Sequence, residues 1–375
     1  MKRIGVLNFF NSNQNYGAVL QAAALQEVLK GLGHSSEHID LVRADPDASL
    51  MRKYFKKIKK NKLGRLFYSC IKTVYFQILG KSVFDQFRNK YIVSSTIRYE
   101  GMQDLEKNYF DYEIVVVGSD QVWRLKYIKE LAPAYFFSFL GSSVKKISYA
   151  ASFGLDRWEA EKDSDLTKIL KKYLQDFSAI SVREDSGVNI CNDIFDVEAH
   201  HVLDPTLLIG RSFFEQIAKI KVPSVRSRKL VYYKLDKSDD FKDMVRFIED
   251  QYGFESEDIY HKTVSKKKKA YRPVEDWLGL IASSDLVITD SYHCVCFSML
   301  FNKDFFYFAN KDRGLSRVES LLHMFDVPKD RIVHNFNKEQ LTSLIQLKID
   351  YAHINRRLVV LQEESLRFLK SAIDF

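Results

Sequence analysis

The stretch that most constrains this fold lies at residues 285–301, where an apolar run of strand length passes into an apolar run of helical length. The junction between them is polar and contains Asp290, Ser291 and His293. This order predicts a strand, a tight turn and a helix. In an open α/β sheet, ligands bind where the carboxyl end of a strand meets the next helix, because free backbone N–H groups converge there. His293 is therefore the first candidate for a functional side chain.

The same pattern recurs along the chain and predicts an α/β protein with parallel sheets. Strands are predicted at residues 3–9, 111–120, 146–154, 177–187, 201–206, 229–234 and 304–308, and most of them end in small or polar residues. Helices are predicted at residues 18–31, 240–251 and 276–284 and over the last 30 residues. Polar strand ends along one sheet edge would line a ligand site, as in doubly wound sheets.

Length and cysteine content set the class of protein. At 375 residues the chain exceeds the usual size of one hydrophobic core, so we expect two domains. Its first residues enter a short strand rather than a signal peptide, and no uncharged stretch reaches the roughly 18 residues of a membrane span, so we expect a cytoplasmic protein. Four cysteines, at positions 70, 191, 294 and 296, do not make a disulfide framework in a chain of this length. Cys294 and Cys296 lack the second ligand pair of a zinc site and fall in the predicted apolar helix, so we expect them to pack in the core.

The net charge of +8 is concentrated in one segment. Residues 51–90 carry twelve Lys or Arg and one acidic residue, so the rest of the chain has a net charge of −3. No nucleic-acid-binding motif accompanies this charge, and we expect no nucleic-acid partner. Two interpretations stay open: a helical excursion at about 51–92 that packs on its domain, or peripheral membrane contact through residues 51–80. The four lysines at 266–269 are predicted to lie in an exposed loop.

Six short segments, taken in order, resemble those of the polysaccharide pyruvyl transferase family and span about residues 4–320. They are Asn-Tyr-Gly-Ala-Val-Leu-Gln at 15–21, Val-Gly-Ser-Asp-Gln-Val-Trp at 117–123, Ser-Tyr-Ala-Ala-Ser-Phe-Gly at 148–154, Ser-Val-Arg-Glu at 181–184, Leu-Asp-Pro-Thr at 203–206 and Thr-Asp-Ser-Tyr-His at 289–293. The resemblance implies two Rossmann-like domains that face a cleft, similar to the glycosyltransferase B architecture. On this basis we expect an acceptor-side domain at 1–207, a donor-side domain at 208–345 and a closing helix at 346–375.

The resemblance also implies a reaction. The pyruvyl group of phosphoenolpyruvate passes to two hydroxyls of one sugar, which forms a cyclic ketal and releases phosphate. The implied acceptor is a nucleotide- or lipid-linked saccharide of capsule, exopolysaccharide or cell-wall synthesis, and a lipid-linked acceptor would place the protein at the inner face of the membrane. No cofactor or metal is expected, since phosphoenolpyruvate is a co-substrate.

Protonation and charge pairing decide which residues such a reaction needs. The enol carbon must be protonated before C2 becomes electrophilic, and histidine, with an ordinary pKa of about 6.5, suits this task. His293 matches the family's acid. Guanidinium groups pair with phosphate and carboxylate in a bidentate way. The resemblance thus assigns donor binding to Arg183, Ser291, Arg317 and its neighbour Arg313.

Other roles have alternatives. Asn15, Tyr16, Gly17 and Asp120 are the candidates for acceptor binding. Asp290 either caps the helix that begins at the histidine or acts as a base toward a sugar hydroxyl. Arg183 could instead pair with the neighbouring acids at 184 and 185, and residues 313–317 could form a solvated loop.

One departure concerns the positions just before the histidine. Many family members carry an arginine there, whereas this chain has Ser291 and Tyr292. Either the helix N-terminus and the downstream arginines hold the donor's phosphate, or donor recognition differs. Two further functions stay open: a glycosyltransferase of the same fold that uses a nucleotide sugar, and a catalytically idle glycan-binding protein.

Overall fold

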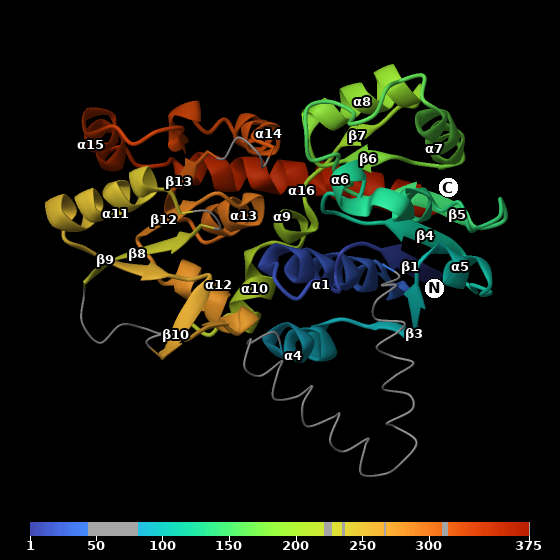
Figure 1. Ribbon diagram of the computed structural model, residues 1–375, viewed down its shortest axis with the longest axis horizontal. Helices are drawn as coiled ribbons and strands as arrows, with labels where there is room; N and C mark the ends of the chain where they lie inside the picture. The colour runs from blue at the N-terminus through green and yellow to red at the C-terminus, as the bar shows by residue number, and fades with distance from the viewer. Residues whose placement is uncertain (44–81, 221–226, 235–236, 266–267, 310–313, 375) are drawn as a thin grey trace, which may run out of the picture.

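The protein was analysed as a computed structural model that describes residues 1–43, 82–220, 227–234, 237–265, 268–309 and 314–374. Figure 1 shows two lobes side by side, with the N-terminal elements in one and the elements from β8 onward in the other. Each lobe contains a five-stranded parallel sheet. The chain therefore has the predicted α/β fold of two Rossmann-like halves, similar to the glycosyltransferase B architecture.

The N-terminal sheet has the strand order β3-β2-β1-β4-β5. Its strands are β1 (Arg3–Leu7), β2 (Ser35–Val42), β3 (Ser94–Glu100), β4 (Ile114–Val117) and β5 (Lys145–Ser148). All four residues of β4 are buried, as their apolar sequence predicts for a central strand. The helices of this half are α1 (Tyr16–Gly31), α4 (Ser82–Tyr91), α5 (Met102–Glu106), α6 (Leu125–Ile128), η1 (Lys129–Phe136), α7 (Asp165–Gln175), α8 (Asp185–Phe195), α9 (Pro205–Ile209) and α10 (Arg211–Ile217).

The C-terminal sheet has the order β14-β13-β12-β8-β9. Its strands are β8 (Arg228–Tyr233), β9 (Phe254–Asp258), β12 (Leu286–Thr289), β13 (Asp304–Phe308) and β14 (Ile332–Val333). The helices are α11 (Asp239–Tyr252), α12 (Val274–Ala282), α13 (Tyr292–Leu300), α14 (Ser316–Met324), η2 (Lys329–Arg331), α15 (Lys338–Gln346) and α16 (Tyr351–Asp374). The strand, turn and helix predicted at 285–301 are thus present as β12 and α13.

Three secondary-structure predictions were wrong. Of the strand predicted at 201–206 only His201 is in a strand, because Asp204 caps helix α9, which begins at Pro205. The strand predicted at 177–187 is only β6 (Ser181–Val182), which pairs with β7 (His200–His201) in a separate two-stranded sheet, because Asp185 already begins helix α8. The lysine run predicted as a loop contributes Lys268 and Lys269 to a hairpin of β10 (His261–Ser265) and β11 (Lys268–Tyr271). His261 pairs with Tyr271 and Lys262 with Ala270 across this antiparallel hairpin, and the run of lysines gives no sign of the strand in the sequence.

Two helices join the halves. Helix α1 follows β1, yet Tyr16, Val19 and Leu20 pack in one core cluster with Val287 and Trp277 of the C-terminal half. Helix α16 crosses from the C-terminal lobe to the N-terminal lobe and ends near β5 (Figure 1). Its residues Ile354 and Leu361 pack in that shared core, and Leu369 and Ile373 pack under the N-terminal sheet.

Parts of the remaining predictions fall on residues that the structure does not describe. The basic segment at 51–80 and Cys70 lie outside the described residues, whereas Cys191, Cys294 and Cys296 are buried free thiols. The domain limits at 207 and 345 stay a prediction. Within the described part of the chain, none of the helices combines the length and apolar character needed to span a membrane.

Candidate active site

A cavity of about 860 Å³ lies where the two sheets face each other. In the N-terminal sheet the strand order reverses between β1 and β4, and in the C-terminal sheet it reverses between β8 and β12. Ligands of doubly wound sheets bind outside the carboxyl ends of strands at such switch points. The residues that follow these four strands line the cavity: Ser12, Gln14, Asn15, Asp120, Gln121, Tyr233, Asp290, Ser291, Tyr292 and His293.

Most of the residues predicted for the site meet in this cavity, although they come from distant parts of the chain. Its wall includes Asn15, Asp120, Asp290, Ser291, His293 and Arg317. Tyr16, Gly17 and Arg183 are not part of that wall, and all three are buried. Arg313 lies outside the described residues.

The imidazole of His293 is held between the two halves and is only 5% exposed. Its Nε2 lies 3.4 Å from Oδ2 of Asp204 and 3.3 Å from Nη1 of Arg183. On the other side, Nδ1 lies against the first turn of α1, where a Cβ at Gly17 would be only 2.2 Å away. Only glycine at position 17 lets the helix approach the ring this closely.

Asp204 is a buried carboxylate with both oxygens engaged. Its Oδ1 accepts hydrogen bonds from the backbone N–H and the hydroxyl of Thr206 (2.9 and 2.6 Å), which caps the first turn of α9. Its Oδ2 accepts from the Ser119 hydroxyl (2.7 Å) and from Nη1 of Arg183 (3.0 Å). Burial alone would raise the pKa of Asp204, but the adjacent His293 and Arg183 outweigh it and hold that pKa well below its usual range. The carboxylate is therefore ionised.

Arg183 lies behind His293 and does not reach the cavity. Its side chain is fully buried, with its guanidinium carbon 4.2 Å from the centre of the Tyr292 ring. Burial lowers the pKa of Arg183, but the Tyr292 oxygen and the carboxylates of Asp204 and Glu184 outweigh this, so the pKa is raised. The arginine therefore pairs with an acid 21 residues away in the chain as well as with its neighbour Glu184, whose Oε2 is 4.0 Å from its Nε. Tyr292, at the position that departs from the family pattern, covers it.

The cap of helix α13 is Ser291 and not Asp290. The Ser291 hydroxyl accepts a hydrogen bond from the backbone N–H of Cys294. Ser291 is therefore the N-cap of the helix. The capping role considered for Asp290 is therefore wrong, because its carboxylate points to the other side. Asp290 Oδ2 accepts a hydrogen bond from Nζ of Lys234 at 3.1 Å, and both side chains are buried. Asp290 lines the cavity as a residue, but its paired carboxylate is 0% exposed.

The acceptor-side candidates differ in what their side chains do. Asn15 lines the cavity, and its side-chain Oδ1 caps α1 by accepting a hydrogen bond from the Ala18 N–H (3.3 Å). Asp120 also lines the cavity, with a backbone φ of 86° that non-glycine residues rarely adopt. Tyr16 instead stacks on Trp277, with ring centroids 5.0 Å apart, and its hydroxyl accepts from the backbone N–H of Arg272 (2.9 Å). Its ring holds the two halves together and is not exposed to the cavity.

Fixed positive charge reaches the cavity from both halves. Arg317, near the start of α14, is 8% exposed, and burial together with the nearby Arg183 lowers its pKa. Arg43, directly after β2, lines the opposite wall. Arg43, Tyr127 and Tyr260 at the wall, and Asp204 and Lys234 behind it, had no role in the sequence analysis. Asp204 carried a signal, since it lies in one of the six segments, but its contact with His293 spans 89 residues of sequence.

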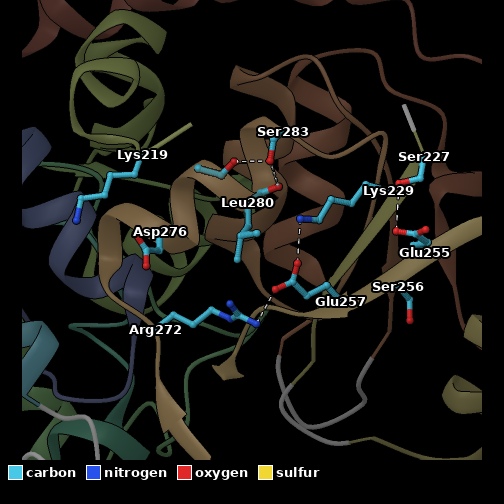
Figure 2. Close-up of a pocket in the computed structure, with 11 residues that line it drawn as sticks. Lys219, Ser227, Lys229, Glu255, Ser256, Glu257, Arg272, Asp276, Leu280 and Ser283 are labelled. Atoms are coloured by element: carbon cyan, nitrogen blue, oxygen red, sulfur yellow. Dashed lines mark hydrogen bonds and ion pairs between the residues drawn. The ribbon is translucent and has the colours of Figure 1, made fainter. Parts of the chain in front are cut away.

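A second cavity of about 480 Å³ lies beside α12 and β9 in the C-terminal half. Three of its charged groups are paired, as Figure 2 shows: Lys229 and Arg272 both contact Glu257, at 2.9 and 2.7 Å. No residue predicted for the site lines it. In the described ranges, no group of three or more His, Cys, Asp or Glu side chains is arranged to hold a metal ion.

Comparisons with known proteins bear on the family and the fold. The sequence model of the family described as polysaccharide pyruvyl transferase matches residues 15–312. No curated protein sequence matches the chain. A putative UDP-N-acetylglucosamine 2-epimerase from Listeria monocytogenes has a similar structure, with a TM-score of 0.58 and 9% identity over 100% of this chain and 97% of that chain. UDP-GlcNAc 2-epimerase from Neisseria meningitidis bound to UDP-GlcNAc gives a TM-score of 0.53 and 12% identity over 98% and 100%. At these identities the likeness concerns the fold alone.

Proposed function

Because the chain belongs to the polysaccharide pyruvyl transferase family, we propose that it transfers the pyruvyl group of phosphoenolpyruvate to two hydroxyls of a saccharide, with formation of a cyclic ketal and release of phosphate. One observation carries the proposal. His293, the residue that matches the family's acid, lies in a cavity where the ligand-binding edges of both sheets meet. The same cavity presents arginines for an anionic donor and carboxylates for a hydroxyl-bearing acceptor.

The proposed chemistry begins with proton transfer. His293 gives a proton to C3 of the enol, and C2 becomes electrophilic. One acceptor hydroxyl adds to C2, phosphate leaves with the electrons of its C2–O bond, and the second hydroxyl adds to the same carbon. One hydroxyl proton replaces the proton that His293 gave, and the other leaves with the phosphate, so the reaction balances.

The charges of the cavity fit this sequence of steps. Arg317 and Arg43 supply positive charge at the wall for the phosphate and carboxylate of the donor. Arg183 adds positive charge from behind His293, although its side chain does not line the cavity. Asp120 and Asp290 face the cavity from opposite halves, and we assign them to the two acceptor hydroxyls.

The test is phosphate release from phosphoenolpyruvate in the presence of a panel of nucleotide- and lipid-linked saccharides. Release is expected only with a matching acceptor, together with a product heavier than the acceptor by one pyruvyl ketal in mass spectrometry. His293→Gln is expected to lower kcat by about 10²- to 10⁴-fold, the usual contribution of a general acid. His334→Gln, at an exposed position, is the matched control. Full activity of His293→Gln would contradict the proposed acid.

The acceptor we propose is nucleotide- or lipid-linked and belongs to capsule or exopolysaccharide synthesis in the cytoplasm. The basic segment at 51–80 supports the lipid-linked case, since anionic lipids attract such a segment by about 1 kcal/mol per Lys or Arg near the surface. Flotation with anionic liposomes, with and without residues 51–80, tests peripheral contact at the inner membrane face. Equal partitioning of the two forms would contradict it.

A further inference from the structure

We propose that Arg88 is the positioning residue of the loop at residues 8–15, between β1 and α1, and that this loop binds hydroxyl groups of the saccharide acceptor. The inference deepens the proposed function and rests on it for the identity of the acceptor. The hold of Arg88 on the loop is a property of the free protein and can be measured without a substrate.

The guanidinium of Arg88, in α4, contacts this loop with both of its Nη groups. Nη1 donates to the backbone carbonyl oxygens of Ser12 (2.7 Å) and Phe10 (3.4 Å). Nη2 donates to the side-chain oxygen of Asn13 and to the carboxylate of Asp85, one turn earlier in α4. The planar fork of an arginine makes these four contacts at once, whereas the single ammonium nitrogen of a lysine cannot reproduce them.

Helix α4 is a firm support for the arginine. Its Phe84 and Phe87 are fully buried in the core cluster that includes residues of both halves, and the Phe84 ring lies 5.0 Å from that of Tyr16, the first residue of α1. A second tie comes from Asn11, whose Nδ2 donates to the carbonyl oxygen of Leu41 in β2 at 2.6 Å. All of residues 8–15 are described and none belongs to a helix or strand, so contacts from α4 and β2 hold the backbone of the loop.

The loop residues at the cavity suit a saccharide. Ser12, Gln14 and Asn15 line the cavity. Hydroxyl and amide side chains donate and accept hydrogen bonds without carrying charge, as the hydroxyls of a sugar do, whereas the arginines of the wall suit an anionic donor. Because Ser12 Oγ and Asn15 Oδ1 already accept from backbone N–H groups, we assign the exposed Gln14 to an acceptor hydroxyl.

Hydrogen–deuterium exchange of the free protein tests the positioning role. The backbone N–H groups of Ser12 and Phe10 donate within the loop, to the Phe9 carbonyl oxygen (3.1 Å) and to Oδ1 of Asn8 (3.2 Å). In Arg88→Lys we expect these amides to exchange about 10- to 100-fold faster than in the wild type, which is the effect of losing a hydrogen bond to a charged group.

Arg246→Lys is the matched control for this exchange measurement. Arg246 also pairs with an acid one turn earlier in its helix, Asp243 at 2.9 Å, but it is exposed and does not line the cavity. Exchange of residues 8–15 is expected to stay at the wild-type rate in this variant. Wild-type exchange of the loop in folded Arg88→Lys would overturn the inference.

Steady-state kinetics with the saccharide that supports phosphate release test what the loop binds. In Arg88→Lys we expect KM for this acceptor to rise about 10- to 100-fold, with kcat and KM for phosphoenolpyruvate near their wild-type values, because the loop would contribute to binding and not to the acid. Gln14→Ala, at an exposed position, is expected to raise the same KM about 3- to 10-fold and to leave loop exchange unchanged. An unchanged acceptor KM in either variant, or a change confined to kcat or to KM for phosphoenolpyruvate, would overturn the inference.

The two proposals can fail separately. If Arg88→Lys accelerates exchange of the loop but the wild type releases no phosphate with any acceptor, the proposed function falls and the hold of Arg88 on the loop stands. If ketal forms and Arg88→Lys changes neither loop exchange nor the acceptor KM, the inference falls and the proposed function stands.

Discussion

At the scale of single residues, Gly17 controls how closely the first helix approaches His293. A methyl group at this position would lie 2.2 Å from Nδ1 and 2.4 Å from Cγ, so the ring must move. We expect Gly17→Ala to lower kcat by at least about 100-fold, because displacement of a catalytic group by about 1 Å costs this much. Steady-state phosphate release measures the change.

The control for this substitution lies on the same helix. Gly31, the last residue of α1, is exposed and has no heavy atom within 4 Å of the Cβ that alanine would add. Gly31→Ala is expected to retain full activity. Equal activity of the two alanine variants would show that the close approach of Gly17 to the His293 ring does not affect catalysis.

His38 makes stability depend on pH. It is fully buried in β2, with Nδ1 3.2 Å from Oδ1 of Asn8, and burial lowers its pKa to about 4. Since the unfolded chain takes up this proton near pH 6.5 and the folded protein only near pH 4, stability falls as pH drops through that window. The difference amounts to about 3 kcal/mol across the window.

Urea unfolding between pH 7 and pH 4.5 measures this contribution. His38→Gln lacks the titrating group, so its free energy of unfolding is expected to decline less steeply with falling pH than that of the wild type. His334→Gln, exposed, is expected to follow the wild-type slope. Parallel slopes for His38→Gln and the wild type would contradict the assignment.

At the scale of elements, the start of α13 depends on its cap. The Ser291 hydroxyl holds the Cys294 N–H, so Ser291→Ala is expected to lower the free energy of unfolding by about 1 kcal/mol, and Ser291→Asn to restore most of it. Ser164 caps α7 in the same way, far from the cavity. Ser164→Ala should cost similar stability and leave KM for phosphoenolpyruvate unchanged.

Denaturant unfolding and KM together separate capping from donor binding at Ser291. A pure cap predicts that Ser291→Asn behaves like the wild type in both. A raised KM for phosphoenolpyruvate in Ser291→Asn, with stability restored, would instead support the donor-binding role predicted from the sequence.

Elements with a continuous apolar run were predictable, and edge strands were not. The sequence analysis identified β4, β12 and β13, whose apolar residues are buried on both faces. It did not identify β3, where most positions are exposed and no apolar run marks the strand. It extended β6 too far, because Arg183 and Glu184 are buried by ion pairs and not by strand pairing. Arg43 was missed because β2, the strand that it follows, was not predicted: charged and polar residues interrupt its apolar positions.

At the scale of the whole molecule, Tyr16 joins the halves and is expected to make them unfold together. Its hydroxyl donates to the backbone carbonyl of Arg272 (3.0 Å) and accepts from that residue's N–H (2.9 Å). Tyr16→Phe leaves both groups without a partner in the core and is expected to cost about 1–3 kcal/mol. Tyr109→Phe, 88% exposed, should change nothing.

Circular dichroism and tryptophan fluorescence, followed during denaturant unfolding, check this expectation. Because α1 packs in the core of the C-terminal half, we expect one coincident transition by both probes in the wild type. Separate transitions for the two probes would show that the halves unfold independently.

Part of the site could be predicted because its residues follow strands. The prediction was incomplete because some contacts of the site join residues that are far apart in the sequence. Asn15, Asp120, Asp290 and His293 follow strands on both sides of the switch points, and a sequence pattern locates such positions. The partner of His293 was not predictable. The sequence analysis placed Asp204 in a strand at 201–206, whereas it caps α9, and only the packing of one half on the other brings it to the imidazole.

Helix α16 supplies a contact to the segment beside the site, and this contact can form only late in synthesis. The Leu203 N–H, next to Asp204, donates to the hydroxyl of Ser365 at 3.0 Å, across 162 residues. A ribosome that adds about 5–20 residues per second reaches Ser365 roughly 10–30 s after Leu203. In the last part of that interval, once Arg317 has been added, the nascent chain holds every residue proposed for the cavity, but Leu203 N–H still lacks its partner Ser365. The segment that carries Asp204 therefore acquires this hydrogen bond only after every residue proposed for the cavity has been synthesised.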